Sequence, residues 1–360
     1  MQKKNKHISV LTALSIISAI YGLVLIASAT HSSGSISNVV VQAIGIVIGI
    51  AVMLVLKALD FEILLELNKI IFIVYTALLI LVLFIGTGRE QTGTNGWIAL
   101  GPVNVQPSEF AKIGFILTFS AHLGSTKNIN SFKSISLLLL HILVPLALIL
   151  LQPDYGTAMV FIFITIVMLF FAGLKIRYFV AAGTIFLAST PFIWMFLDEF
   201  QKNRILVFLN PELSPAGAGY NVIQSKLAVG AGKLFGKGIF QGTQIQMDFL
   251  PGKHTDFIFA VAGEELGFLG SILIIALLCT IIFILIKNAA EVKKSSGSYI
   301  LAGISAMLIF QSFENIGMCI GIMPVTGIPL PFFSYGGSSI LTTFISIGIA
   351  LSVLKRKDYI

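Results

Sequence analysis

The chain has 360 residues, of which 56% are hydrophobic and 11% charged, and its mean hydropathy is +0.97. These values exclude an ordinary soluble domain. The formal net charge of +7 could suggest nucleic-acid binding, but the positions of the basic residues indicate membrane topology instead. We therefore predict an integral membrane protein with no nucleic-acid partner.

Apolar runs of about 20 residues recur along the chain, each long enough to cross a bilayer. We predict an all-α polytopic protein, a single membrane domain over residues 1–360, with ten spans. The first run lacks a small-residue cleavage site and is therefore a span rather than a signal peptide. Cys279 and Cys319 lie within apolar runs and are expected to be core residues. The predicted spans are residues 9–29, 38–58, 69–86, 109–124, 134–151, 157–173, 178–197, 257–286, 299–320 and 338–354.

The basic residues divide unequally between the two sides of the predicted membrane. Segments on the side of the termini contain fifteen Lys and Arg residues, whereas the short loops on the other side contain only Arg89. The positive-inside rule places both termini in the cytoplasm, and the extra charge faces anionic membrane lipid.

Two predicted outer loops are longer than connections need to be. Residues 87–108 form a glycine-rich loop, and residues 198–256 form a loop of 59 residues between spans seven and eight, with six basic residues. A short interfacial helix is expected from Tyr220 to Val229. We expect its faces to divide into Val222, Ile223 and Leu227 toward lipid and Gln224 and Lys226 toward water.

Glycines at positions 230, 232, 236 and 238 of this loop resemble a phosphate loop, but their spacing does not fit the nucleotide-binding motif. We expect instead a flexible, basic cradle for a phosphate group.

The large outer loop ends at Asp256, directly before span eight. We predict that Thr255 caps this helix and that Asp256 lies in its first turn, where backbone N–H groups favour an anion. Small residues follow on one face at helical spacing and predict a seam for a neighbouring membrane helix. They are Ala260, Gly263, Gly267 and Gly270. A carboxylate at the mouth of a helix bundle is the first candidate for catalysis.

Other charges within or beside the spans are further candidates. Glu109 and Lys112 are spaced to form an ion pair, with a purely structural role as the alternative. Asp154 lies in a Pro-Asp-Tyr-Gly turn, where a solvated carboxylate is the alternative. At least one of Glu264 and Glu265 should face a polar interior, whereas Glu314 is assigned no role.

Several motifs together resemble the SEDS family (shape, elongation, division and sporulation), and the resemblance covers essentially the whole chain. Two stretches, QKNRI and YNVIQSK, are more similar to its elongation branch, whereas Lys253 departs from the Glu or Gln common in relatives. The motifs are GWIALGPVNVQPSEFAKIG at 96–114, QPDYGTA at 152–158, the stretch 201–232, LPGKHTDFIFAVAGEELGFLG at 250–270 and GIPLPFFSYGGSS at 327–339.

The resemblance implies a peptidoglycan glycosyltransferase of the bacterial cytoplasmic membrane, which polymerises lipid II at the outer face during cell elongation. Asp256 corresponds to the essential carboxylate of the family and would act as general base. Trp97 corresponds to the family's loop tryptophan. From their charge and position, we predict that Arg204, Lys226, Lys233 and Lys112 hold phosphate. The predicted substrate-binding residues also include Glu109, Asp154, His254 and Thr255.

The implied protein partner is a class B penicillin-binding protein, a transpeptidase. A divalent cation, Mg²⁺ or Mn²⁺, is compatible with a pyrophosphate substrate, but no cluster has clear metal-ligand spacing. A lipid-precursor flippase and a non-catalytic scaffold are the alternative functions. The candidate polar residues gather on the predicted outer side, which favours an enzyme over a flippase that needs a path through both leaflets.

Overall fold

The computed structural model describes residues 2–32, 34–88, 94–100, 103–197, 199–213, 217–292 and 295–356. It is nearly all helical, which confirms the predicted fold class. A long helix lies at each predicted span. These helices are α1 (Gln2–Ala29), α2 (Ile36–Ala58), α4 (Asn68–Ile85), α6 (Pro107–Ser125), α7 (Phe132–Leu150), α8 (Tyr155–Phe171), α9 (Ile176–Phe196), α13 (Ile258–Glu291), α14 (Ser296–Ile320) and α15 (Gly337–Arg356).

Among the described residues, seven helices are long and apolar enough by themselves to cross a membrane: α1, α2, α4, α7, α13, α14 and α15. Helices α8 and α9 contribute shorter apolar segments, and α6 carries the buried charges of Glu109 and Lys112. The count of ten spans therefore stays a prediction.

Shorter elements connect the long helices. They are α3 (Phe61–Glu66), β1 (Ile98–Leu100), β2 (Val103–Val105), α10 (Glu199–Leu209), the 3₁₀ helix η1 (Pro211–Leu213), α11 (Ala218–Ala231) and α12 (Thr243–Gln246). Strands β1 and β2 form an antiparallel hairpin in which Ile98 pairs with Val105.

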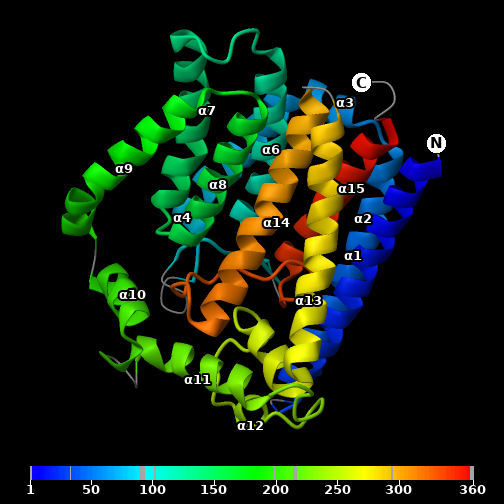
Figure 1. Cartoon of the computed structure of the whole chain (residues 1–360), viewed down its shortest axis with the longest axis vertical. Helices are drawn as coiled ribbons and strands as arrows, with labels where there is room; N and C mark the ends of the chain where they lie inside the picture. The colour runs from blue at the N-terminus through cyan, green and yellow to red at the C-terminus, as the bar shows by residue number, and fades with distance from the viewer. Residues whose placement is uncertain are drawn as a thin grey trace.

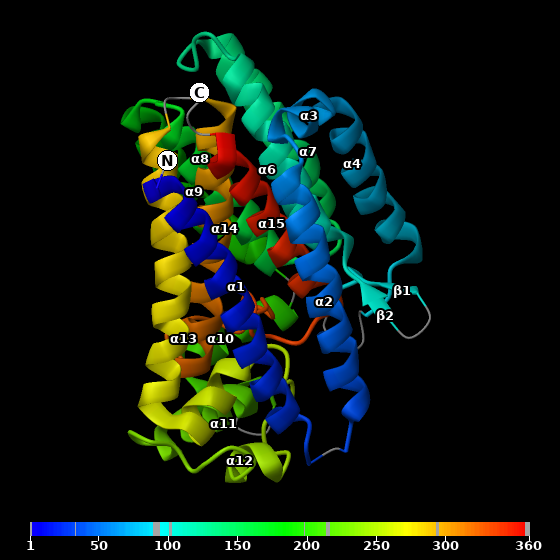
Figure 2. The ribbon, with the colours of Figure 1, turned by 90° about the vertical axis from the view of Figure 1, so that its right-hand side faces the viewer.

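Helix α14 lies at the centre of the bundle and packs against α13, α8 and α6 (Figure 1). Helix α15 is also largely buried, between α2 and α1 (Figure 2). Both α1 and α15 have their terminal ends at one end of the molecule, and α11 and α12 lie at the other. In contrast, α9 leans away from the bundle, and none of its described side chains is fully buried.

Helix α13 is broken at Gly267, whose φ of 66° and ψ of −158° are not helical. The loop 233–238 replaces the backbone hydrogen bonds that the break removes, which is necessary because an unpaired peptide group inside a membrane protein is costly. The four replacement bonds run from Lys237 N to Glu264 O (3.0 Å), Gly238 N to Glu265 O (2.9 Å), Phe268 N to Lys233 O (2.8 Å) and Leu269 N to Leu234 O (3.2 Å).

This arrangement corrects one prediction in part. The small-residue face of α13 receives α11 and the loop after it at Gly263, which lies against Val229, and a Cβ on Gly232 would lie 1.8 Å from Gly263 O. Gly270 meets a neighbouring membrane helix as predicted, since Tyr21 of α1 donates to Gly270 O at 3.0 Å. Gly236 permits close packing of the loop into the helix break, since a Cβ there would lie 2.1 Å from Glu265 O. The phosphate cradle stays a prediction.

The predicted short helix is present as α11, but its faces differ in part from the prediction. Val222 is 5% exposed and packs into the protein rather than toward lipid, together with Ala228. Ser225 fixes this face by donating a hydrogen bond from Oγ to Cys319 O at 2.8 Å. Leu227 is exposed, as expected. Packing of α11 on α13 and α14 therefore determines which face of α11 is buried.

Candidate active site

Asp256 lies in a turn before α13, not in its first helical turn. The N-cap position is Phe257, and Thr255 makes no cap bond because its Oγ1 donates to Gly252 O at 3.2 Å. Phe257 N also bonds to Gly252 O, so residues 252–257 close a compact turn. The prediction that Thr255 caps the helix is wrong, and Asp256 is positioned by other means.

The backbone of the His254–Asp256 segment is held from α14 and from the loop between α14 and α15. Three consecutive carbonyl groups each accept a hydrogen bond. The donors are Tyr335 N to His254 O (2.9 Å), Ser334 Oγ to Thr255 O (2.6 Å) and Asn315 Nδ2 to Asp256 O (2.8 Å). Asn315 Nδ2 also donates to Ile328 O at 2.8 Å, which ties this loop to the same segment.

The carboxylate of Asp256 is half-buried and lies beside Gly327, where a Cβ would be 3.7 Å from its Oδ2. Burial raises the pKa of Asp256 to about 6, against the lowering effects of a hydrogen bond with Thr255 and of the Arg204 charge. Arg204 on α10 interacts electrostatically with both Asp256 and Asp154. A basic carboxylate thus faces a cation that is able to bind an anionic group.

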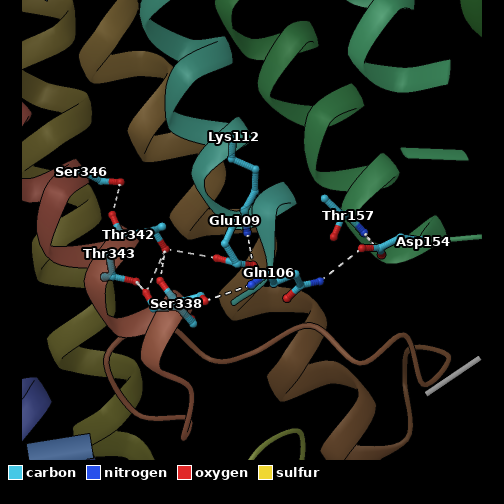
Figure 3. Close-up of polar contacts among 10 residues, drawn as sticks. Gln106, Glu109, Lys112, Asp154, Thr157, Ser338, Thr342, Thr343 and Ser346 are labelled. Atoms are coloured by element: carbon cyan, nitrogen blue, oxygen red, sulfur yellow. Dashed lines mark hydrogen bonds and ion pairs between the residues drawn. The ribbon is translucent and has the colours of Figure 1, made fainter. Parts of the chain in front are cut away.

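A separate set of polar contacts joins the ends of α6, α8 and α15 (Figure 3). Lys112 Nζ and Glu109 Oε1 form the predicted ion pair at 2.6 Å, and both side chains are buried. Thr342 of α15 donates from Oγ1 to Glu109 Oε2 at 3.2 Å. Gln106 Nε2 donates to Asp154 Oδ2 at 3.3 Å, so the network joins the ends of α6 and α8.

Asp154 is not a solvated turn residue. Its side chain is 7% exposed and caps α8 by accepting the N–H of Thr157 at 3.0 Å. Burial raises its pKa, while the Thr157 bonds and the Lys112 charge lower it and the Glu109 charge raises it. Asp256, Arg204, Asp154, Lys112 and Glu109 therefore form one electrostatically connected series.

Comparison with known proteins identifies the fold family. The family model described as cell cycle protein, FtsW/RodA/SpoVE, matches residues 7–359. The chain belongs to this family. The SEDS resemblance is thereby confirmed.

Named relatives come from more than one branch of the FtsW/RodA/SpoVE family. Peptidoglycan glycosyltransferase MrdB of Escherichia coli strain K12 is 40% identical over 267 residues, 74% of this chain and 72% of the relative. Stage V sporulation protein E of Bacillus subtilis strain 168 is 38% identical over 315 residues, 87% of this chain and 85% of the relative.

Solved structures share the fold. A chain in a structure titled "Structural coordination of polymerization and crosslinking by a peptidoglycan synthase complex" has a TM-score of 0.81 at 28% identity, covering 99% of this chain and 98% of that one. The rod shape determining protein RodA of Thermus thermophilus has a TM-score of 0.72 at 29% identity, covering 96% of each chain.

The remaining candidates from the FtsW/RodA/SpoVE motifs lie around this series in different ways. The His254 ring packs near the Tyr335 ring, with centroids 5.4 Å apart. Trp97 is half-buried, and its backbone pairs with Thr87. Lys226 is exposed beside Gly321, and Lys233 is exposed on the loop that fills the break in α13. Among the described residues, no interaction joins Trp97, Lys226 or Lys233 to Asp256.

Glu264 and Glu265 both face a polar interior and both hold the outer loop. Glu264 accepts hydrogen bonds from Gln244 N (3.0 Å) and Ile245 N (3.1 Å) and pairs with Lys237 at 2.7 Å. Glu265 accepts from Ser28 Oγ and Gln246 Nε2. Their contacts are those of structural anchors for α12.

Lys253, which departs from the family pattern, is another anchor. It is 5% exposed and donates to Ser32 Oγ (2.8 Å) and Asp248 Oδ1 (2.6 Å). It thereby ties the turn before Asp256 to the end of α1. Over the described residues, no three or more His, Cys, Asp or Glu side chains are grouped as metal ligands.

Sequence reasoning did not assign roles to Asn315 and Ser334, which orient the Asp256 segment. Both lie in or next to motifs that the sequence made visible, because Asn315 follows the intramembrane Glu314 and Ser334 lies in PFFSYGGSS. The available signal for Asn315 was an amide next to the Glu314 carboxylate within an apolar span.

Proposed function

We propose that this chain polymerises lipid II, the undecaprenyl-pyrophosphate disaccharide-pentapeptide, at the outer face of the cytoplasmic membrane, with Asp256 as general base. The chain is a peptidoglycan glycosyltransferase of cell-wall synthesis. The observation that carries the proposed role of Asp256 is its half-buried carboxylate beside Arg204. Its pKa is raised to about 6.

In the proposed step, a sugar 4-hydroxyl attacks the anomeric carbon of a second lipid II. The new C1–O4 bond forms, the bond from C1 to the pyrophosphate oxygen breaks, and the hydroxyl proton passes to the Asp256 carboxylate. At neutral pH most of the Asp256 population is ionised, and it is a stronger base than an ordinary aspartate. The raised pKa therefore suits a proton acceptor.

The leaving pyrophosphate needs cations. Arg204 is the nearest candidate, because its charge acts on both Asp256 and Asp154, and a guanidinium binds phosphate oxygens bidentately. Lys112 is held in an ion pair by Glu109 and adds a second cation to the same polar network. We assign Trp97, Lys226, Lys233, His254 and Thr255 to the surrounding substrate surface, and a Mg²⁺ or Mn²⁺ ion on the pyrophosphate remains part of the proposal.

The proposed partner is a class B penicillin-binding protein. Its support is the similarity to a chain of a peptidoglycan synthase complex whose title joins polymerization to crosslinking. Assignment to the elongation branch is also a proposal, since the relatives include a glycosyltransferase MrdB and a sporulation protein. The proposed location is the bacterial cytoplasmic membrane with both termini inside.

The decisive experiment supplies fluorescent lipid II to the purified full-length protein, alone and with its transpeptidase. The wild type should produce long glycan strands. Asp256→Asn should insert, fold and bind the transpeptidase normally, and its polymerisation rate should fall by about 10²–10⁴, the usual contribution of a positioned base. Near-normal polymerisation by this variant at saturating lipid II would rule out the base role.

Two further measurements separate the alternatives. Recovery of Asp256→Asn at higher Mn²⁺ or Mg²⁺ would assign the carboxylate to metal binding instead. Transport of lipid II across a vesicle without polymerisation would favour the flippase. Binding of the transpeptidase with neither activity would favour the scaffold.

A further inference from the structure

Glu314 of α14 is a buried acidic side chain that the proposed reaction does not use. It is 0% exposed. Its Oε1 accepts the hydroxyl of Thr326 at 2.8 Å, whereas its Oε2 has no hydrogen-bond partner among the described residues. A carboxyl group inside an apolar helix bundle is costly, and an ionisable residue kept at such a position points to a function. The bond to Thr326 is the contact through which Glu314 can act.

Thr326 belongs to residues 325–328 of the α14–α15 loop, a segment that lies between α8 and Asp256. On one side, a Cβ on Gly156 in the first turn of α8 would lie 3.0 Å from Thr326 O, so the two backbones are in close contact. On the other side, a Cβ on Gly327 would lie 3.7 Å from Asp256 Oδ2. Gly327 has a φ of 75°, which favours glycine at this position. The segment therefore forms one wall beside the Asp256 carboxylate.

Two consecutive residues of α14 hold this wall on either side of Gly327. Glu314 accepts from the Thr326 side chain, and Asn315 Nδ2 donates to Ile328 O at 2.8 Å. Both α14 side chains are 0% exposed, so their positions are fixed by the packing around them. Of the two bonds, that of Asn315 goes to a backbone carbonyl, whereas that of Glu314 joins two side chains and can be removed from either end.

We propose that Glu314 is a positioning residue for Asp256: through its bond to Thr326 it keeps the 325–328 segment against the Asp256 carboxylate. Release of Thr326 lets the segment move away and admits water beside Asp256. Because burial is what raises the pKa of Asp256 to about 6, added water lowers that pKa again and leaves a weaker base. The inference rests on the proposed role of Asp256 as general base.

The test measures kcat, KM and the pH profile of lipid II polymerisation by the full-length protein with its transpeptidase. Thr326→Val removes the donor of the bond, and Glu314→Leu removes its acceptor. Each should lower kcat about tenfold with little change in KM, since a small displacement at a reacting group is costly to the rate. Each should also move the acidic limb from about pH 6 toward the pKa of an ordinary aspartate. The double variant should be no slower than either single one, because both changes remove the same bond.

Glu314→Gln is the conservative variant. It keeps an oxygen that accepts from Thr326, and the Glu314 charge is not among the effects that set the pKa of Asp256, so kcat and the acidic limb should stay at wild-type values. Thr165→Val is the matched control for Thr326→Val, because the Thr165 hydroxyl donates within its own helix, to Phe161 O at 2.8 Å. If Glu314→Gln is as slow as Glu314→Leu, the bond to Thr326 is not what matters, and the proposal is overturned.

A second arm separates this inference from the base role itself. A water-soluble carbodiimide with glycine ethyl ester modifies accessible carboxyl groups, and mass spectrometry follows the modification of Asp256. Its rate should rise severalfold in Thr326→Val and Glu314→Leu and stay unchanged in Glu314→Gln. Near-normal polymerisation by Asp256→Asn would refute the base role but leave this measurement valid. Should Glu314→Leu fail to fold, Thr326→Val still tests the contact. A lower unfolding midpoint with unchanged kcat and unchanged Asp256 modification would make Glu314 purely structural and overturn the proposal.

Discussion

Asp256 shows how a single side chain is adjusted by opposing effects. Burial raises its pKa to about 6, and the nearby charge of Arg204 lowers it from the value that burial alone would give. A general base must be ionised, so protonation removes activity. We expect kcat/KM for polymerisation to fall as the pH decreases through about 6, approaching tenfold per pH unit below it.

Replacing Arg204 tests the direction of this effect. Arg204→Gln removes a charge that lowers the pKa of Asp256, so the pKa should rise and the acidic limb of the pH–rate profile should move to higher pH. Lys226→Gln removes an equal charge that does not affect this pKa, and its limb should stay in place. A limb that stays in place in Arg204→Gln would contradict the electrostatic coupling.

The Glu109–Lys112 pair gives a second prediction. Both side chains are almost fully buried, so Lys112→Ala leaves an unpaired buried carboxylate and should cost about 3–5 kcal/mol of folding free energy. Replacing both residues by apolar ones should cost less. Thermal unfolding in detergent measures this difference.

Activity of the double variant separates the two roles of this pair. If the pair also serves the substrate, the well-folded double variant should remain inactive in lipid II polymerisation. Full activity of the double variant would show that the pair has only a structural role.

Sequence reasoning singled out residues whose chemistry is out of place in an apolar chain. Asp256, Glu109 and Lys112 stand out in this way. Asn315 and Ser334 do not, because they act on backbone carbonyls 59 and 79 residues distant in the chain. Local pattern carries no information about such partners.

At the level of elements, helix α13 and the loop after α11 depend on each other. Gly236 has a φ of +79°, and a Cβ there would meet the backbone of Glu265. Gly236→Ala should therefore cost about 1–3 kcal/mol and lower the unfolding midpoint by several degrees.

Gly230→Ala is the matched control for this substitution. Gly230 lies inside α11 with open space around its Cα, so alanine should be neutral or stabilising there. Equal midpoints for the two variants would contradict the close packing of the loop into the break.

The predicted helices were right in type and position because each apolar run is long. The break at Gly267 was not predicted, since glycines at helical spacing are equally typical of a continuous helix that packs closely against another. The distinction depends on the loop 233–238, whose backbone supplies the missing hydrogen bonds. Non-local backbone pairing of this kind has no signature in a single sequence.

For the whole molecule, the distribution of basic residues predicts its orientation. A cysteine at Ser35 should react with an impermeant thiol reagent added outside cells, whereas a cysteine at Asn128 should react only after the membrane is opened. The native Cys319 is buried as predicted, whereas Cys279 is exposed on α13 and is not the core residue that the sequence predicts. Because Cys279 lies within a candidate membrane span, neither cysteine should contribute background. Reversed labelling would place Asp256 in the cytoplasm and remove the basis for its role.

The break in α13 has a consequence for hydrogen–deuterium exchange. Residues 233–238 have the sequence of a surface loop, yet the amides of Lys237 and Gly238 are bonded to helical carbonyls. They should exchange as slowly as the first turns of α13 and lose protection together with them, as one cooperative unit. Asp256 immediately precedes that unit.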